Sequence, residues 1–140
     1  MKENQTLVKG NNLPISWKDS VEVCRFIRKK SLQKAKHMLQ QVLDKKLAVP
    51  IKRYGLADRG HRKGKIGPGF YPQKATKHIL QLLNTLEANA QDKGLNVSDL
   101  ILIKLIPNKG TSIWHYGRHR RRRMKRCHLQ IIAEEIKSKK

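Results

Sequence analysis

The sequence of 140 residues contains only two cysteines, Cys24 and Cys127. They lie far apart and form no CxxC pair, so the sequence predicts neither a disulfide framework nor a zinc finger. His115, His119 and His128 lie near Cys127 in the sequence, but their spacing matches no zinc-binding pattern. We therefore expect buried thiols, and neither a metal nor another cofactor.

Long apolar runs are also missing. The longest candidate, residues 100–106, contains Lys104 and is far shorter than the ~20 residues of a membrane-spanning helix. Residues 1–14 lack the apolar run of a secretory signal. We therefore expect no membrane insertion, and a protein that stays in the cytoplasm or, in a cell that has one, the nucleus.

Acidic residues are few. Ten Asp and Glu stand against 32 Lys and Arg, which gives a formal net charge of +22. No pair of carboxylates and no Ser, His and Asp set suggests a catalytic site, so we do not expect an enzyme. A domain this basic repels itself until an anion neutralises it, which favours nucleic acid as the partner and an anionic membrane surface as second choice.

The chain length predicts one domain, spanning residues 1–140, and apolar periodicity predicts three helices within it. The first follows a capping box formed by Ser16 and Asp19, and the second is capped by Ser31. The third begins at Pro72 and ends near Gly94. Their predicted buried residues are Trp17, Val21, Cys24, Ile27, Leu32, Ala35, Leu39, Val42, Leu43, Ala75, Ile79, Leu82, Leu83, Leu86 and Ala90.

Two apolar segments, residues 100–106 and 129–132, are typical of strands and predict an antiparallel pair. The residues between them form either a loose loop or a continuation of both strands to a tip near Gly117. In the second case each arm is ~16 residues and ~50 Å long. A two-stranded ribbon without an apolar face is not stable alone, so its partner would have to order it.

Residues 51–71 show no periodicity and are rich in Gly, Lys and Arg, with Asp58 as the only acid. A loop of this length inside a compact domain usually has a function. Residues 60–66 invite comparison with a phosphate-binding P-loop. The spacing of Gly60 and Gly64 is one residue too short, and Ile66 stands where Ser or Thr would bind magnesium, so the comparison fails.

The densest basic run, residues 118–126, contains seven Lys or Arg, and no acid occurs from Lys104 to Ala133. Consecutive arginines indicate phosphate binding, because the guanidinium group pairs phosphate in two places. RNA is favoured over DNA, since no helix carries a major-groove recognition face and Trp114 and Tyr116 can stack on unpaired bases. The predicted RNA-binding residues are Lys52, Arg53, Arg59, Arg62, Lys63, Lys65, Lys109, Trp114, His115, Tyr116, Arg118, His119, Arg120, Arg121, Arg122, Arg123, Lys125 and Arg126.

Two other hypotheses remain open. A basic architectural protein that packages DNA would use the same run as its arm, and retention on chromatin would distinguish it from an RNA-binding protein. The run also resembles a nuclear address, which is compatible with either function.

Several stretches together resemble one family. NLPISWKDS, AVPIKRYG, EANAQDKGLNVSDL and RCHLQIIAEE are similar to the large-subunit ribosomal protein numbered 22 in bacteria and 17 in eukaryotes. The resemblance extends from about Asn12 to Glu135, and the insertion at residues 51–71 resembles the archaeal and eukaryotic branch. Lys29 stands where the family often has Gly.

The resemblance implies an α+β fold, with three helices packed on a small antiparallel sheet and a long protruding β-hairpin at about residues 103–129. It places the hairpin tip at residues 115–121. It also implies a monomer within the ribosome that organises large-subunit ribosomal RNA and contacts neighbouring ribosomal proteins. The hairpin tip would line the tunnel of the nascent peptide. In a eukaryotic cell the chain would pass through the nucleus for assembly.

Overall fold

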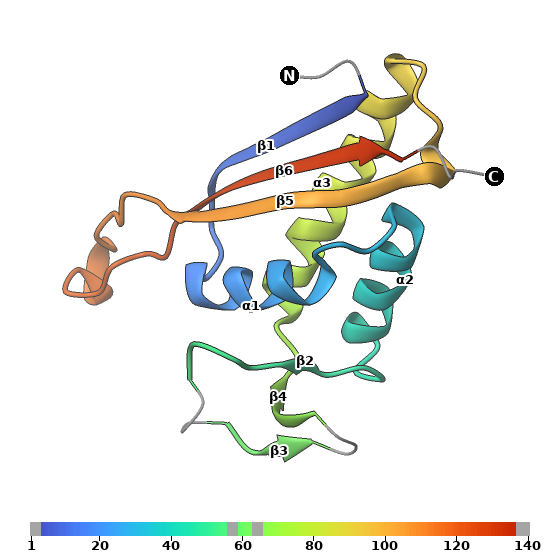
Figure 1. The fold of residues 1–140 in the computed structure, drawn as a ribbon. Coiled ribbons are helices and arrows are strands. Elements are labelled where there is room, and N and C mark those ends of the chain that lie inside the picture. Colours follow the sequence, from blue (N-terminus) through green and yellow to red (C-terminus); the bar gives the residue numbers. More distant parts are fainter. Residues whose placement is uncertain (1–3, 56–58, 63–65, 137–140) are drawn as a thin grey trace.

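The computed structural model describes residues 4–55, 59–62 and 66–136. Figure 1 shows helices packed behind a three-stranded antiparallel sheet, a smaller sheet below them, and a hairpin that projects from the larger sheet. This arrangement confirms the predicted α+β class with three helices, an antiparallel sheet and a protruding hairpin.

The three predicted helices are confirmed as α1 (Trp17–Ile27), α2 (Leu32–Leu43) and α3 (Gln73–Asp92). Helix α1 begins as the capping box predicts, because the Asp19 backbone N–H donates to the Ser16 hydroxyl oxygen at 3.4 Å. The predicted return bond from the Asp19 carboxylate is not formed. That carboxylate accepts a hydrogen bond from Arg59 instead.

The larger sheet contains β1 (Gln5–Leu13), β5 (Leu100–Lys109) and β6 (Cys127–Glu135), in the order β1-β6-β5. The two predicted strands are confirmed, and each is longer than expected. Strand β1 was not expected. It pairs antiparallel with β6 from Gln5 opposite Glu134 to Gly10 opposite Leu129. Its alternate residues Thr6, Val8 and Gly10 are buried, which is the period of a half-buried strand.

Helix α3 crosses β1 closely at Gly10. A Cβ atom at this position would approach the Leu82 Cδ1 atom to 2.9 Å, closer than carbon atoms pack. Glycine at this position therefore leaves room for the Leu82 side chain against the strand.

One apolar core lies between the helices and the inner face of the larger sheet. Full burial of such side chains stabilises the fold by about 1.5 to 3 kcal/mol each. The largest fully buried side chains are Ile15, Ile27, Leu32, Leu39, Ile79, Leu83, Leu86, Leu100, Leu102, Leu105, Leu129 and Ile131. Cys24 and Cys127 are also buried as free thiols, as expected.

Side chains from the helices satisfy the outer edge of β5. The Arg28 guanidinium donates to the Leu105 carbonyl at 3.3 Å, and the Trp17 indole N–H donates to the Pro107 carbonyl at 3.0 Å. Pro107 itself offers no N–H on this edge strand.

Side chains at the end of α3 likewise donate hydrogen bonds to carbonyls on the outer edge of β1. The Asn89 amide donates to the Leu7 carbonyl at 3.1 Å, and the Lys93 ammonium donates to the Gln5 carbonyl at 3.0 Å. Asn89 and Lys93 lie one helical turn apart, so a single face of α3 serves successive outward carbonyls of the strand.

Regular pairing in the hairpin ends at Lys109 and Cys127. Of the two alternatives for this segment, continuous strands to Gly117 with arms of ~50 Å are therefore excluded, and the irregular alternative is closer to the structure. Residues 110–126 form an irregular end that contains one isolated bridge, between Trp114 and Arg123, and a 3-10 turn, η2 (Gly117–His119). These residues have neither a third strand nor an apolar layer to cover them, which is what regular pairing requires.

Residues 51–71 were expected to lack secondary structure, and this expectation is also corrected. The segment continues from β2 (Val49–Pro50) through β3 (His61–Arg62) and β4 (Gly67–Phe70), which form a small antiparallel sheet in the order β2-β4-β3. Strands of two to four residues are too short for periodicity to reveal. We call residues 51–71 the basic extension.

The turn between α1 and α2 places Lys29 in the left-handed region, with a φ of 61°. Its backbone N–H donates to the Leu102 carbonyl at 2.9 Å, and the Leu102 N–H donates to the Lys30 carbonyl at 3.0 Å. The turn therefore pairs with β5, and this pairing requires the left-handed residue. Glycine, which the family often has here, adopts that conformation without steric cost.

We predict that Lys29→Gly raises the free energy of unfolding by about 0.5 to 1 kcal/mol, because it removes left-handed strain that exceeds the entropy cost of glycine. Lys30→Gly is the matched control, since Lys30 does not have a positive φ and is expected to lose stability on the same substitution. Urea denaturation followed by circular dichroism measures both. Destabilisation by Lys29→Gly would contradict the strain argument.

Candidate nucleic-acid interface

The hairpin end is held by backbone hydrogen bonds that continue past the regular ladder. The Gly110 N–H donates to the Arg126 carbonyl at 2.9 Å, and the Met124 N–H donates to the Ile113 carbonyl at 2.7 Å. A Cβ atom on Gly110 would lie 3.0 Å from the Arg126 Cβ atom, so the two arms approach closely at this point. The chain reverses at Gly117, which has a φ of 65°, inside the range expected for the tip.

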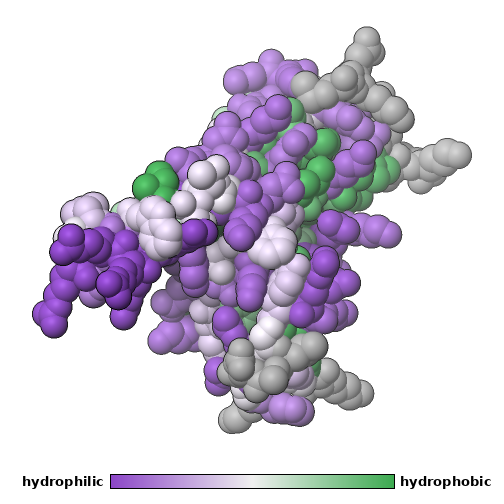
Figure 2. Space-filling view, turned by 90° about the vertical axis from the view of Figure 1, so that its left-hand side faces the viewer, coloured by the Kyte–Doolittle hydropathy of each residue, from purple (hydrophilic) through white to green (hydrophobic). Residues whose placement is uncertain are grey.

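The cations of this end point outward. Arg118, His119, Lys125 and residues 120–123, which are all arginines, are exposed, as is Lys109. Figure 2 shows hydrophilic side chains gathered over the protruding hairpin end. The three ion pairs among the described residues all lie elsewhere, at Lys36–Glu87, Lys46–Asp44 and Arg59–Asp19. The positive charge of the hairpin end is therefore not neutralised within the described part of the chain.

Two aromatic residues lie within this basic surface. Trp114 is 54% exposed and Tyr116 is 86% exposed. The Arg123 guanidinium lies 4.3 Å from the centre of the Trp114 ring. Trp114 therefore packs on the returning arm and still exposes about half of its surface. Tyr116 remains free to stack.

The basic extension brings a second group of predicted residues to the surface. Lys52, Arg53 and Arg62 are exposed, whereas Arg59 is partly buried. Arg62 also donates to the Gly69 carbonyl at 3.2 Å and lies over the Tyr71 ring. Of the predicted residues, Lys63 and Lys65 lie outside the described part of the structure.

The extension is held to the body by Glu22, which is only 2% exposed. Its Oε1 atom accepts from the backbone N–H groups of Arg53 at 2.8 Å and Tyr54 at 3.0 Å, and its Oε2 atom accepts from that of Lys52 at 3.2 Å. A buried carboxylate is stabilised when it accepts hydrogen bonds from several backbone N–H groups. Those N–H groups gain the acceptor that they would otherwise lack. This anchor fixes the backbone of Lys52 and Arg53, whose side chains are exposed.

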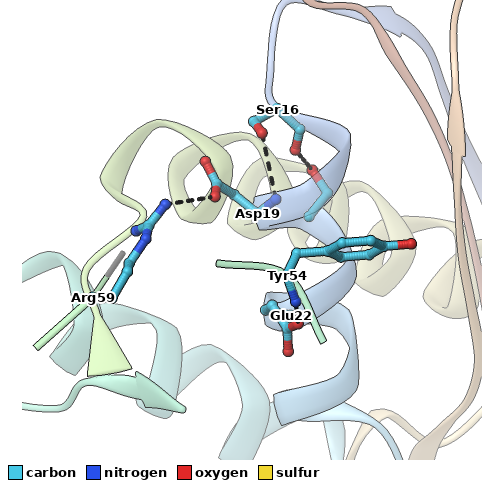
Figure 3. Close-up of polar contacts among 6 residues, drawn as sticks. Ser16, Asp19, Glu22, Tyr54 and Arg59 are labelled. Carbon is cyan, nitrogen blue, oxygen red and sulfur yellow. Dashed lines mark hydrogen bonds and ion pairs between the residues drawn. The ribbon is translucent and has the colours of Figure 1, made fainter. Parts of the chain in front are cut away.

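Asp19 forms a second contact with the extension. Its Oδ1 atom accepts from Arg59 Nη2 at 3.3 Å, and the same guanidinium lies 3.9 Å from the centre of the Phe70 ring. Figure 3 shows both acids on one side of α1, facing the extension. Arg59 was predicted to bind RNA, but its guanidinium already has these partners within the protein.

A groove of about 640 Å³ separates the returning arm of the hairpin from the body. Four segments line it: the hairpin, the start of α1, the extension and the start of α3. We call it the hairpin groove. Its lining residues are Pro14, Ser16, Asp19, Arg59, Phe70, Tyr71, Pro72, Gln73, Lys74, Ala75, His115, Arg123, Met124, Lys125 and Arg126.

Residue-type reasoning missed Glu22, Tyr71 and Lys74. Glu22 lies between apolar positions of α1, where a carboxylate is expected to face solvent. Tyr71 and Lys74 lie outside the dense basic runs and join the hairpin residues only through the fold. An acid within an apolar stripe, next to a basic loop, is the one sequence signal that would have indicated the anchor.

The described residues contain no group of three or more His, Cys, Asp or Glu side chains that could hold a metal ion. None of the described helices is long and apolar enough to cross a membrane. Burial raises the pKa of the Cys24 thiol and of the Cys127 thiol, so both stay protonated and unreactive near neutral pH.

Comparison with known proteins places these surfaces in a family context. The family model described as "Ribosomal protein L22p/L17e" matches residues 8–134. "Large ribosomal subunit protein uL22" of Nanoarchaeum equitans is 43% identical, over 96% of this chain and 81% of the relative. The protein of that name from Archaeoglobus fulgidus is 39% identical, over 89% and 84%. That from Thermofilum pendens is 38% identical, over 89% and 85%. All three relatives are archaeal, in agreement with the branch that the insertion indicates.

We predict that Glu22→Ala lowers the free energy of unfolding by about 2 to 4 kcal/mol, because three backbone N–H groups lose their acceptor. Amide hydrogen exchange of Lys52, Arg53 and Tyr54 is expected to accelerate. Glu87→Ala is the matched control, since Glu87 pairs with Lys36 at the surface and is expected to lose less than about 1 kcal/mol. Equal losses for the two variants would show that Glu22 anchors nothing.

Proposed function

Because the chain belongs to the L22p/L17e family of ribosomal proteins, we propose that it binds and organises ribosomal RNA within the large ribosomal subunit. The observation that carries this proposal is the hairpin end, where a run of exposed cations has no acidic partner among the described residues. Such a surface repels itself in isolation and gains affinity by releasing counterions from a phosphate backbone.

Neutralisation of phosphates is the proposed mechanism. The arginines at residues 120–123 contact phosphates with their planar guanidinium groups, while Tyr116 and the exposed half of Trp114 stack on unpaired bases. The basic extension contacts a second RNA segment through Lys52, Arg53 and Arg62. Since the two surfaces extend from separate elements of one body, the protein holds together RNA segments that otherwise repel each other.

The proposal also covers the surroundings of the chain. It acts as a monomer within the ribosome, without catalysis, beside neighbouring large-subunit proteins and in the cytoplasm. The body lies against RNA at the subunit surface, and the hairpin carries its turn at Gly117 to the wall of the nascent-peptide tunnel. Membership of a ribosomal family favours this function over DNA packaging.

We expect replacement of residues 120–123 by alanine to leave helicity unchanged, because none of the four arginines is buried. Affinity for ribosomal RNA should fall, and the slope of log affinity against log salt should decrease by up to about 3. Incorporation into large subunits, measured by sedimentation, should fall with it. Replacement of the four residues by lysine is the control: it keeps the charge and the salt slope but loses the planar contacts. Normal incorporation of the alanine variant would refute the proposed function.

The tunnel position has its own test. We expect a photo-reactive phenylalanine analogue in place of Tyr116 to cross-link to a stalled nascent peptide inside the ribosome. The same analogue in place of His78, which lies on α3 in the body, should give no peptide adduct. If position 116 cross-links to RNA but not to the peptide, the proposed RNA binding stands and the proposed tunnel contact is refuted.

A further inference from the structure

The hairpin groove has the composition of an anion site. Arg123, Lys125 and Arg126 line one wall and Lys74 the other. Among the described lining residues, Asp19 is the one acid, and its carboxylate pairs with Arg59. The groove therefore has a net positive charge from two elements that are far apart in the sequence.

Arg126 also carries an unsatisfied donor in this region. Its Nε atom is buried and has no hydrogen-bond partner among the residues that the structure describes. A buried donor without an acceptor destabilises a structure, and a guanidinium group is best satisfied by the paired oxygens of a phosphate or carboxylate. The remaining side-chain contact of Arg126 is a weak one, from Nη2 to the Met124 sulfur at 3.8 Å.

The size and the aromatic lining of the groove limit the kind of ligand that it can bind. A volume of about 640 Å³ is typical of sites for small molecules and suits one or two nucleotides. Tyr71 and His115 lie in the lining and offer ring faces for an unpaired base. The Arg62 guanidinium lies 5.3 Å from the centre of the Tyr71 ring.

From this geometry we propose that the hairpin groove binds an unpaired nucleotide of an RNA strand that passes between the hairpin and the body. Arg126, Lys125 and Lys74 contact its phosphates, and Tyr71 stacks on its base. This inference rests on the proposed function and adds a recognition site within it. The outward surfaces bind any phosphate backbone, whereas the groove selects single-stranded RNA.

The test compares two probes with the full chain: a single-stranded RNA of about ten nucleotides and its duplex with the complementary strand. Lys74→Ala should weaken single-strand binding several-fold and lower its salt slope by about 0.7. Lys77→Ala is the matched control, an exposed lysine one turn along α3 that does not line the groove, and it should change neither quantity. Tyr71→Leu should weaken single-strand binding about tenfold. None of the three variants should alter duplex binding.

Equal behaviour of Lys74→Ala and Lys77→Ala on the single strand would overturn the inference, and so would an equal loss on both probes. Thermal denaturation checks that Tyr71→Leu is folded. If that variant does not fold, Lys74→Ala still tests the groove. The alanine variant of residues 120–123 distinguishes a failure of the groove from a failure of the proposed function. If it is impaired while Lys74→Ala behaves like the control, the groove fails and the proposed function stands. If it binds RNA normally, the proposed function itself fails.

Discussion

The pairing of β6 on both of its sides is the interaction on which the rest of the structure depends. It joins β1, from the start of the chain, to β5, which precedes the hairpin end. Leu129 and Ile131 on its inner face are fully buried in the core beneath the helices. Because β6 is also the returning arm of the hairpin, the same hydrogen bonds that close the fold fix the direction in which the arginines leave it. A basic segment attached by one end could not hold such a position.

Acidic side chains of the body and basic side chains of the hairpin end differ in the partners that they have within the described part of the chain. The few acids of the body act on their own chain: Glu22 holds the backbone of the extension, Asp19 holds Arg59, and Glu87 pairs with Lys36. The hydrogen bond from Lys36 lowers the pKa of the Glu87 carboxyl, so this pair persists at neutral pH. The densest group of exposed cations without an ion pair among the described residues lies on the hairpin end. Glu22 and Asp19 thus fix the position of the basic extension, and they do not neutralise the exposed cations of the hairpin end.

The sequence predicted the elements that have long apolar patterns, and it missed those that are defined by contacts. Apolar residues of α3 recur at helical spacing over five turns, and those of β5 alternate as in a strand. These patterns indicate the two elements directly. Strand β1 escaped prediction because Lys9 and Gly10 interrupt its apolar residues, although Gly10 is the position that α3 requires. Strands β2, β3 and β4 are too short to have a period. The hairpin groove could not be foreseen, since Tyr71 and Arg126 line one groove only in the folded protein and are far apart in the sequence.

The saturated edges of the larger sheet have a consequence for the life of the chain before assembly. An open strand edge is a template for strand addition, and through it for aggregation. Here Trp17 and Arg28 occupy the outward carbonyls of β5, while Asn89 and Lys93 occupy those of β1. These donors make strand addition at either edge of the sheet less favourable in a newly synthesised copy. The high positive charge that awaits neutralisation adds mutual repulsion between free copies, so the features that suit the protein to its partner also protect it while the partner is absent.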